Sequence, residues 1–257
     1  MIIVKLQGGL GNQMFQIAYG LSLKYKFKED IKFDTRSYLN NVKDRDLQIK
    51  KFNIEIDIDI DKITNKKFYS IIDDFNYREF INSKDSNYYL DGYWQSEKFF
   101  KESENLIRED FRPSKEIVEK FSNTPFLDTN TISLHVRRGD YITSNGYHPV
   151  QSIEYYQKSI EKIGKYDYIF VFSDDIQWCK DNLKFNNMIF IEGNSNIEDL
   201  YLMSMCKHNI IANSSFSWWS AWLNSNPNKI VIAPNKWFGD KANLNCEDII
   251  PDNWIKI

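Results

Sequence analysis

Residues 131–141 read TISLHVRRGDY. The first six residues are mostly apolar or β-branched, which predicts a buried strand. Two arginines follow directly, and a guanidinium beside a buried strand is costly unless it meets an anion or a carboxylate. Guanidinium groups bind phosphate oxygens through paired hydrogen bonds and keep their charge. We therefore expect an anion site at Arg137 and Arg138. One guanidinium should meet the ligand, and the other should pair with Asp140 or Asp174.

Short apolar runs and amphipathic segments alternate after this stretch, through the second half of the chain. Strands are predicted at residues 168–172, 188–191, 209–212 and 230–233. Helices are predicted at residues 153–163 and 197–206, and after Ser215 or Ser217 as the capping residue. Strands that alternate with helices form a parallel sheet covered on both faces, and such sheets bind ligands at the carboxyl ends of their strands.

The first half shows the same alternation less regularly. Strands are predicted at residues 2–6, 31–34 and 88–93, and helices at residues 13–27 and 97–108. Residues 42–87 carry mixed signals, with the IEIDIDID run at 54–61 as a candidate edge strand. The proline-containing stretch 112–130 is the best candidate for a junction. We predict an α/β protein with two halves, residues 1–120 and 121–257, and a cleft between them.

The composition of the 257 residues argues against several classes of protein. A net charge of −3 disfavours nucleic acid binding, which normally needs a basic surface, so an anionic ligand must meet a few local cations. The three cysteines lack CxxC spacing and the three histidines lie far apart, which disfavours a disulfide framework and a metal site. No segment approaches the roughly 18 uninterrupted apolar residues of a membrane span. We expect a cytoplasmic protein with at most peripheral association with the inner face of a membrane.

Three further polar clusters lie where predicted strands end. Glycines at residues 8–11 lead into a helix and could cradle a phosphate or only form a tight turn, since the third glycine of a dinucleotide fingerprint is absent. Asp174 and Asp175 could bind a metal ion, but we expect them to anchor the arginines or to cap the next helix. The segment Asn213-Ser214-Ser215-Phe216-Ser217 contains small hydroxyl residues, which offer hydrogen-bond donors to phosphate. Asp199 could accept from a guanine edge or only stabilise its helix N-terminus.

Together these clusters resemble glycosyltransferase family 11, the α-1,2-fucosyltransferases of O-antigen and milk-oligosaccharide type. The matching stretches, which span nearly the whole chain, are GGLGNQMFQIAYG at 8–20, GYWQSEKFF at 92–100, HVRRGDY at 135–141, FSDD at 172–175 and EDLYLMSMCKHNIIANSSFSWWSAWL at 198–223. HVRRGDY and ANSSFSWW are specific in combination, whereas the glycine loop alone is not. The resemblance implies a GT-B-like fold of two Rossmann-like halves, with GDP-fucose bound by residues 121–257 and the acceptor by residues 1–120.

The resemblance also implies the reaction. An inverting enzyme of this family moves L-fucose from GDP-β-L-fucose to the 2-hydroxyl of a terminal galactose, in a lipid-linked or free glycan, with no divalent metal and no other cofactor. By analogy with related fucosyltransferases, the catalytic residues would be Arg137 on the β-phosphate, Asn12 near the sugar and Asp140 as the candidate base. The residues expected to bind GDP-fucose are Gly11, Gln13, His135, Arg138, Asp199, Asn213, Ser214, Ser215 and Phe216, with His135 and Asp199 on guanine. The acceptor-side candidates are Trp94, Gln95 and Glu97, of which Glu97 is a second candidate base.

Three other functions remain open at this point. A fucosyltransferase of another linkage, such as α-1,6, would share the arginine motif. A non-catalytic glycan-binding protein would use the aromatic residues, which make up 16% of the chain. A nicotinamide-dependent oxidoreductase would rest on the glycine loop alone.

Overall fold

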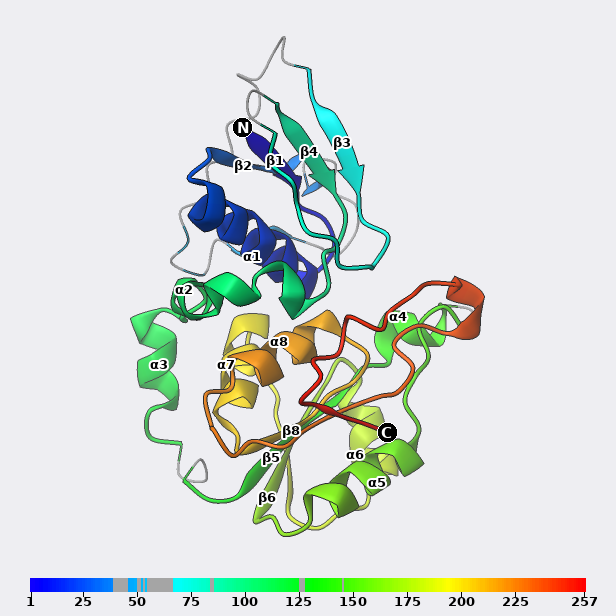
Figure 1. Ribbon diagram of the computed structural model, residues 1–257. Coiled ribbons are helices and arrows are strands. Elements are labelled where there is room, and N and C mark those ends of the chain that lie inside the picture. Colours follow the sequence, from blue (N-terminus) through cyan, green and yellow to red (C-terminus); the bar gives the residue numbers. More distant parts are fainter. Residues whose placement is uncertain are drawn as a thin grey trace. The chain divides into compact units, whose positions relative to one another are not determined.

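The computed structural model describes residues 1–38, 46–49, 52, 54, 67–83, 86–124, 128–144 and 146–257. The chain divides into two compact units (Figure 1). Unit 1 comprises Met1–Ser114 and Asn245–Pro251, and unit 2 comprises Lys115–Leu244 and Asp252–Ile257. The boundary lies inside the predicted junction 112–130, a few residues before the predicted division. The return of the chain to unit 1 near its C-terminus is not evident in the sequence.

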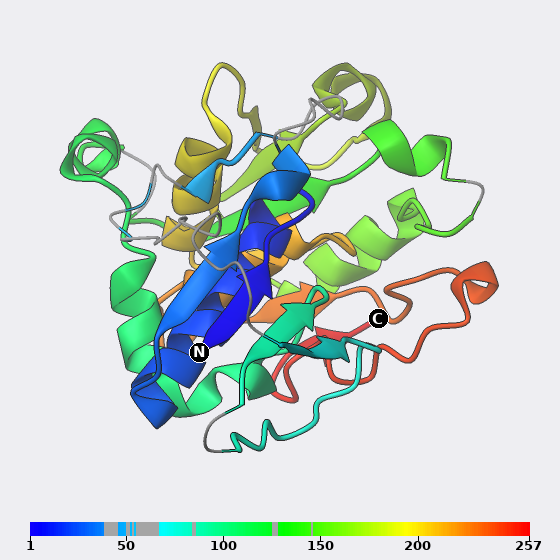
Figure 2. The same cartoon turned by 90° about the horizontal axis from the view of Figure 1, so that it is seen from above.

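Unit 1 is built on a parallel sheet with the strand order β2-β1-β4-β3. The strands are β1 (Ile2–Lys5), β2 (Ile31–Asp34), β3 (Tyr69–Ile72) and β4 (Tyr88–Asp91). Helix α1 (Leu10–Phe27) packs against this sheet, and in Figure 2 strands β1 and β2 run side by side along it. Every residue from Gln13 to Leu23 is buried. A helix that is buried on all sides is the centre of its domain rather than a surface element.

The stretch after β4 differs from its prediction. The sequence predicts one helix at 97–108, but the chain forms the 3-10 turns η3 (Glu97–Phe99) and η4 (Lys101–Ser103) before α2 (Glu104–Asp110). Phe100 leaves the helical path with φ −139° and ψ 12°, and its side chain is fully buried. Burial of such a ring contributes about 2–3 kcal/mol. That gain outweighs the helical hydrogen bonds that are lost at this position.

Other parts of unit 1 lacked a readable pattern. Strand β3 escaped prediction because three of its four residues are exposed, which leaves no apolar alternation. The candidate strand at 54–61 lies, apart from residue 54, outside the described residues. A short turn, η1 (Arg36–Tyr38), follows β2. In the described part of both units, no helix has the length and apolar character to cross a membrane.

Unit 2 contains a six-stranded parallel sheet in the order β10-β9-β8-β5-β6-β7. The strands are β5 (Thr131–Val136), β6 (Tyr168–Ser173), β7 (Met188–Phe190), β8 (His208–Ile210), β9 (Val231–Ala233) and β10 (Ile255–Lys256). The helices are α3 (Lys115–Phe121), α4 (Gly139–Ile142), α5 (Ile153–Ile163), α6 (Ile176–Asn182), α7 (Asn196–Met205) and α8 (Ser215–Leu223), with the turn η5 (Asp240–Ala242). The predicted strands β5 to β9 are confirmed with small shifts at their ends, whereas β10, α3 and α4 were not predicted.

Apolar layers cover both faces of this sheet. Alternate residues of β6 point to opposite faces, as the two-residue period of a strand requires. Ile169 and Val171 pack in one cluster with residues of α5 and α6. Phe170 and Phe172 pack in another with Leu202 of α7. All six residues of β5 are buried, so the strand that carries the arginines at its end is a covered central strand, as predicted.

Candidate functional site

Arg137 follows β5 directly and lies between two carboxylates. Its Nη1 is 3.1 Å from Oδ2 of Asp174, and its Nη2 donates to Oδ1 of Asp140 at 2.6 Å. The guanidinium carbon also lies 5.4 Å from the centre of the Tyr141 ring. The prediction that an arginine pairs with Asp140 or Asp174 is confirmed, because Arg137 contacts both. With its side chain 32% exposed, the guanidinium is held in place and still reaches the surface.

Arg138 is bound to the scaffold. Its Nε donates to Oδ2 of Asp175 at 3.1 Å, and its guanidinium carbon lies 3.9 Å from the centre of the Trp178 ring. The side chain is only 18% exposed. The ring contact and the ion pair fix the direction of this side chain against α6. These contacts favour a scaffold role for Arg138 over the nucleotide contact expected from the resemblance.

The acid pair after β6 anchors the arginine segment. Oδ1 of Asp174 accepts the backbone N–H of Arg138 at 2.9 Å, while its other oxygen meets Arg137. A methyl group at Gly139 would overlap the Asp174 carboxylate, so glycine permits this close approach. Oδ1 of Asp175 accepts the N–H of Trp178 at 3.3 Å and thus caps α6. Both predicted roles of the pair, anchor and cap, are confirmed.

His135 is the last but one residue of β5 and is 5% exposed. Its ring lies 5.6 Å from that of Phe216, and its Nδ1 has no hydrogen-bond partner among the described residues. Burial, together with the nearby charge of Arg137, lowers the pKa of His135 to about 3. The imidazole is therefore neutral at physiological pH. A buried polar atom of this kind normally has a partner, so Nδ1 is a point at which a ligand could bind.

Residues 214–216 form the entry into α8. Ser214 is the capping residue, with extended backbone at φ −133° and ψ 126°, rather than Ser215 or Ser217 as predicted. The helix begins earlier in the chain than predicted, because its first hydrogen bond runs from the N–H of Trp218 to the Ser214 carbonyl oxygen. A helix N-terminus attracts anions through its backbone N–H groups. Ser214, Ser215 and Phe216 therefore lie where a phosphate contact was expected.

Asn213 precedes α8 and links the start of this helix to other parts of unit 2 through hydrogen bonds. Its Nδ2 donates to the carbonyl oxygen of Trp237 at 2.9 Å, and its Oδ1 accepts from Gln151 at 2.9 Å. Its own carbonyl oxygen accepts from the hydroxyl of Tyr141 at 2.9 Å. The side chain is 2% exposed, and both its nitrogen and its oxygen have hydrogen-bond partners. The sequence did not indicate Gln151 or Tyr141 as parts of this arrangement, because neither partner is near residue 213 in the chain.

Asp199 on α7 is available for a ligand, whereas its neighbour performs the helix-capping role. Glu198 accepts the N–H of Ser195 at 2.6 Å in a capping box and also pairs with Lys120. Asp199 accepts only from Asn194 among the bonds to its side chain in the described region, at 3.1 Å. Burial raises the pKa of Asp199. Since Glu198 already stabilises the N-terminus of α7, Asp199 is not needed for that role. This favours the other predicted role of Asp199, as an acceptor for guanine.

The glycine loop of unit 1 is held by Gln13. This side chain is fully buried, and its Oε1 accepts the backbone N–H groups of Gln48 at 3.0 Å and Ile49 at 3.3 Å. Its Nε2 donates to the carbonyl oxygens of Gly8 and Asp46. With all these contacts to backbone, Gln13 supports the loop. The expectation that Gln13 contacts GDP-fucose is therefore weakened. The sequence could not indicate this supporting role, because the partners other than Gly8 lie more than 30 residues away.

Asn12 and Gln95 meet in unit 1. Nε2 of Gln95 donates to Oδ1 of Asn12 at 2.8 Å, which joins the first turn of α1 to the segment after β4. Gln95 and Trp94 are 8% and 4% exposed. Glu97 lies at the start of η3, and its Oε1 is 3.5 Å from Nζ of Lys101. Trp94 and Gln95, two of the predicted acceptor-side residues, are thus buried, and Gln95 contacts Asn12, which was predicted to lie near the sugar. Gly11 is buried in the same first turn of α1 as Asn12.

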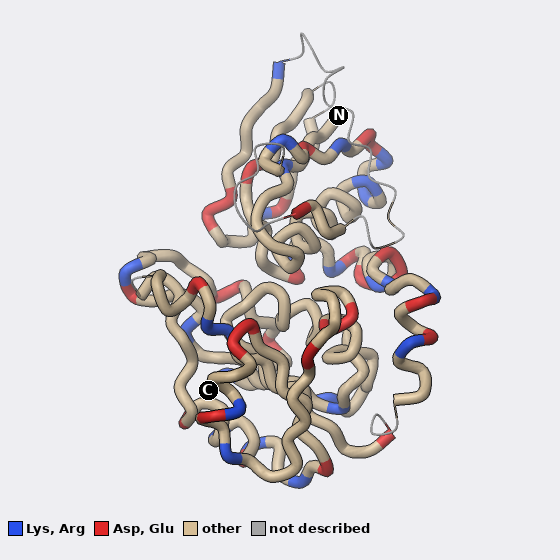
Figure 3. Tube along the Cα trace, turned by 180° about the vertical axis from the view of Figure 1, so that it is seen from behind, with Lys and Arg blue, Asp and Glu red and all other residues tan. Residues whose placement is uncertain are grey.

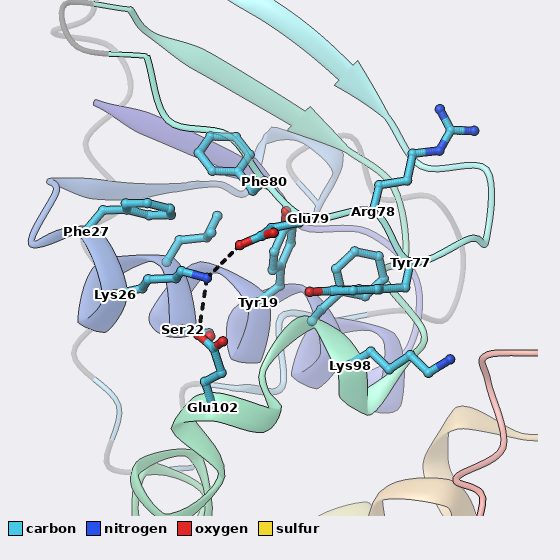
Figure 4. A pocket seen from close by; sticks show the side chains of 12 residues that line it. Tyr19, Ser22, Lys26, Phe27, Tyr77, Arg78, Glu79, Phe80, Lys98 and Glu102 are labelled. Atoms are coloured by element: carbon cyan, nitrogen blue, oxygen red, sulfur yellow. Dashed lines mark hydrogen bonds and ion pairs between the residues drawn. The ribbon is translucent and has the colours of Figure 1, made fainter.

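A recess elsewhere on unit 1 contains none of the predicted site residues (Figure 4). Lys26 crosses it and pairs with Glu79 and with Glu102, each at 3.2 Å. The recess is lined by Tyr19, Ser22, Leu23, Lys26, Phe27, Tyr77, Arg78, Glu79, Phe80, Lys98, Phe99 and Glu102. These contacts hold the segment 77–80 against α1.

Charge is distributed evenly outside the candidate site. Basic and acidic residues are interspersed along both units (Figure 3), in keeping with a net charge of −3. Among the described residues, no three His, Cys, Asp or Glu side chains gather in a way that could hold a metal ion. The cation that the candidate site offers to an anionic ligand is therefore the single guanidinium of Arg137, which lies between Asp140 and Asp174.

Comparison with known proteins identifies relatives of the whole chain. The family model described as Glycosyl transferase family 11 matches residues 1–257. An α-1,2-colitosyltransferase of Escherichia coli is 35% identical over all of this chain and 98% of its own length. The O-antigen biosynthesis glycosyltransferase WbnK of Escherichia coli is 33% identical over 98% of this chain and 99% of its own.

Among solved structures, the chain is similar to the α-1,6-fucosyltransferase NodZ, soaked with GDP-fucose; NodZ comes from Bradyrhizobium. The TM-score is 0.52 at 15% identity, over 86% of this chain and 91% of that one. This likeness concerns the fold. Two α/β units with parallel sheets are the architecture of the GT-B fucosyltransferases, and the predicted fold class is confirmed.

Proposed function

Because the chain belongs to glycosyltransferase family 11, we propose that it is an inverting α-1,2-fucosyltransferase. It transfers L-fucose from GDP-β-L-fucose to the 2-hydroxyl of a terminal galactose in an O-antigen or related oligosaccharide. The observation that carries this proposal is Arg137, a guanidinium oriented by two carboxylates at the end of a central parallel strand. The entry into α8, at residues 214–216, supplies backbone donors for the same anion.

The proposed contacts to the guanine base follow from the chemistry of two residues, His135 and Asp199. Neutral His135 offers a ring nitrogen without a partner among the described residues, which suits the polar edge of a purine. Asp199 offers carboxylate oxygens to the N–H groups of guanine. A carboxylate accepts hydrogen bonds and does not donate them, so it prefers guanine, whose exocyclic amine and ring N–H both donate. We therefore assign both residues to the base.

The reaction breaks the bond between the anomeric carbon of fucose and the β-phosphate oxygen. The electron pair leaves with GDP, and the ring gains oxocarbenium character. Arg137 and the backbone at residues 214–216 stabilise the phosphate charge that develops, and a donor in such a place contributes about 2–4 kcal/mol to the barrier. The galactose 2-hydroxyl attacks the opposite face and loses its proton. Asp140, which is 47% exposed beside Arg137, is the candidate base for that proton, with Glu97 as the second.

We also propose that no divalent metal takes part. Asp174 and Asp175 are the acids that a metal would need at the end of β6, and both are neutralised by arginines. A carboxylate that is already paired with a guanidinium is a poor additional ligand for a cation. In this proposal the N–H groups of Arg137 and of the backbone at residues 214–216 donate to the phosphates in place of a metal ion.

A second donor deserves a test because of one specific finding. The α-1,2-colitosyltransferase is 35% identical to this chain over its whole length. Colitose is fucose without its 3-hydroxyl, so the two GDP-sugars place the same phosphates, base and anomeric carbon in the site. The geometry around Arg137 suits both donors equally, and discrimination between them must come from groups that face the sugar.

The test is a transfer assay with GDP-fucose and GDP-colitose against a panel of galactose-terminated glycans, with and without EDTA. We expect fucose on the galactose 2-hydroxyl, identified by NMR of the purified product, at a rate that EDTA does not change. An α-1,6 linkage would replace the proposed linkage, and preference for GDP-colitose would replace the proposed donor. Loss of activity in EDTA would refute the metal-independent mechanism, and no transfer at all would favour a glycan-binding protein.

A further inference from the structure

Asp73 joins the ends of two strands in unit 1. It follows β3 directly, and its Oδ1 accepts the backbone N–H of Phe75 at 2.9 Å. Its Oδ2 accepts the N–H groups of Tyr93 at 3.0 Å and Trp94 at 2.8 Å, just beyond the end of β4. Three backbone donors on one carboxylate form a rigid junction, since bonds to a charged acceptor are stronger than neutral ones. A methyl group at Gly92 would overlap Asp73, so glycine permits the contact.

The junction holds Trp94 in a strained conformation. Trp94 has φ +54°, in the left-handed region that non-glycine residues avoid. Its ring packs 4.9 Å from Tyr19 and 5.5 Å from Phe99, measured between ring centres. Strained backbone persists only where several contacts enforce it, and such residues cluster at functional sites. Asp73 supplies one of these contacts from a part of the chain that no sequence pattern singled out.

The strained turn sends the next residue, Gln95, toward Asn12. Because Nε2 of Gln95 donates to Oδ1 of Asn12, the carbonyl of Gln95 is oriented as well. Its Oε1 is buried and has no hydrogen-bond partner in the described part of the chain, and the same holds for Nε1 of Trp94. A buried acceptor without a donor destabilises a protein unless a ligand supplies the donor. A hydroxyl group is such a donor, and sugars carry several.

We propose that Asp73 is a positioning residue for substrate: it holds the turn at residues 94–95 so that Oε1 of Gln95 accepts a hydrogen bond from a sugar hydroxyl. This role rests on the proposed function and adds two details to it: Oε1 of Gln95 contacts the substrate, and Asp73 orients Gln95. The hydroxyl belongs either to the acceptor glycan or to the transferred sugar. The chemistry is the same in both cases, and kinetics separate them.

The experiment compares Asp73→Asn, Gln95→Met and the double variant with Asp74→Asn as the matched control. Asp74 is the next residue, is 48% exposed and pairs with Arg78. Asp73→Asn keeps one accepting oxygen but places an NH2 group against a backbone donor. We expect kcat/KM to fall about tenfold in each single variant, as for loss of one hydrogen bond to substrate, and to remain at the wild-type value in Asp74→Asn.

The double variant tests whether the two residues act through one contact. If Asp73 acts through Gln95, the kcat/KM of the double variant equals that of the less active single variant. Independent structural damage would multiply the two losses instead, and that result would overturn the proposal. A rise in KM for the glycan assigns the hydroxyl to the acceptor, and a rise in KM for the GDP-sugar assigns it to the donor.

Deoxy substrates test the ligand side without altering Asp73. One galactoside that lacks a single hydroxyl other than the 2-hydroxyl, or one GDP-fucose analogue that lacks a single ring hydroxyl, such as GDP-colitose, should be used about tenfold less well by the wild type but not by Gln95→Met. Equal discrimination by the two proteins would refute the role of Gln95. This measurement decides the matter even if Asp73→Asn does not fold.

An NMR measurement separates this inference from the proposed function. If the wild type transfers neither fucose nor colitose, the proposed function fails, while the turn can still be examined. The side-chain amide signals of Asn12 should shift in Asp73→Asn and in Gln95→Met and stay in place in Asp74→Asn. Unshifted signals in Asp73→Asn would show that Asp73 does not position Gln95.

Discussion

The hydroxyl of Tyr141 donates a hydrogen bond to the main-chain oxygen of Asn213 at 2.9 Å. This bond connects the segment that carries Arg137 with the entry into α8, although the two are more than 70 residues apart in the chain. The ring of Tyr141 also stacks on His148, at 4.6 Å between centres and 14° between planes. One side chain thus aligns the two groups that we assign to the pyrophosphate.

Replacing Tyr141 with Phe removes this bond and keeps the stacked ring. Loss of a neutral hydrogen bond costs about 1 kcal/mol, so we expect the Kd for GDP to rise about fivefold. Calorimetric titration with GDP measures the change. Tyr147→Phe is the control, because Tyr147 is a nearby tyrosine that is 41% exposed. Equal affinities of the wild type and Tyr141→Phe would mean that the bond does not align the site.

Arg137 and Arg138 should separate function from stability. We expect Arg137→Ala to lower kcat/KM by about 10²–10³-fold, from the 2–4 kcal/mol of a lost transition-state donor, with Tm nearly unchanged. Arg138→Ala should instead lower the free energy of unfolding by about 1–2 kcal/mol, because it removes the stacking on Trp178 and the pair with Asp175. Steady-state kinetics and thermal unfolding measure the two effects. A fully active Arg137→Ala protein would rule out the proposed mechanism.

His135 makes stability depend on pH. Its pKa is about 3 in the folded protein, mainly through burial, and near 6.5 when unfolded. Between these values the unfolded state binds more protons, so stability falls as pH falls through 6.5 toward 3. From pH 7 to pH 5 this single group should lower the free energy of unfolding by about 2 kcal/mol. Urea unfolding of the wild type and of His135→Gln at both pH values isolates it, since the variant should lose less stability over that interval.

Gly139→Ala should damage the site through Asp174. The added methyl group meets the carboxylate that orients Arg137, so the carboxylate must move. We expect GDP affinity to fall about tenfold, comparable to the loss of one charge-assisted hydrogen bond. Gly164→Ala is a useful contrast, because a methyl group there meets no atom within 4 Å, although its φ of +86° carries a conformational cost. If Gly139→Ala bound GDP with the affinity of the wild type, the close approach of Asp174 to residue 139 would not matter for nucleotide binding.

Strand-end chemistry was predictable from the sequence because it depends on local pattern. In a chain whose strands alternate with helices, a buried run followed by two arginines, or by two acids, indicates the carboxyl end of a parallel strand. Pairing of an arginine with Asp140 or Asp174 and capping by Asp175 followed from charge and position alone, whereas the identity of that arginine, Arg137, came from the structure. The burial of Phe100, which breaks the expected helix, depends instead on which partners surround it. That information is tertiary and no periodicity conveys it.

The residues that the sequence missed act across long separations. Asp73 lies in a stretch without readable pattern and acts on backbone groups about 20 residues away. Gln13 looked like a ligand contact because it follows glycines, whereas its amide is used by residues 46–49. A polar side chain next to a glycine loop has the same local signature whether it faces a ligand or the loop itself. Only the fold distinguishes the two.

The strand order of unit 2 has one more consequence. From β5 the chain adds β6 and β7 on one side, then crosses back and adds β8, β9 and β10 on the other. Connections from β5 and from β8 therefore leave neighbouring strands toward opposite faces of the sheet, so the carboxyl ends of these two strands are the point of reversal at which parallel sheets bind ligands. Chain routing fixes this point, so it keeps its place through changes of side chains that preserve the strand order. A family could exchange one activated sugar for another by altering the residues around the point of reversal, while its position in the sheet would remain.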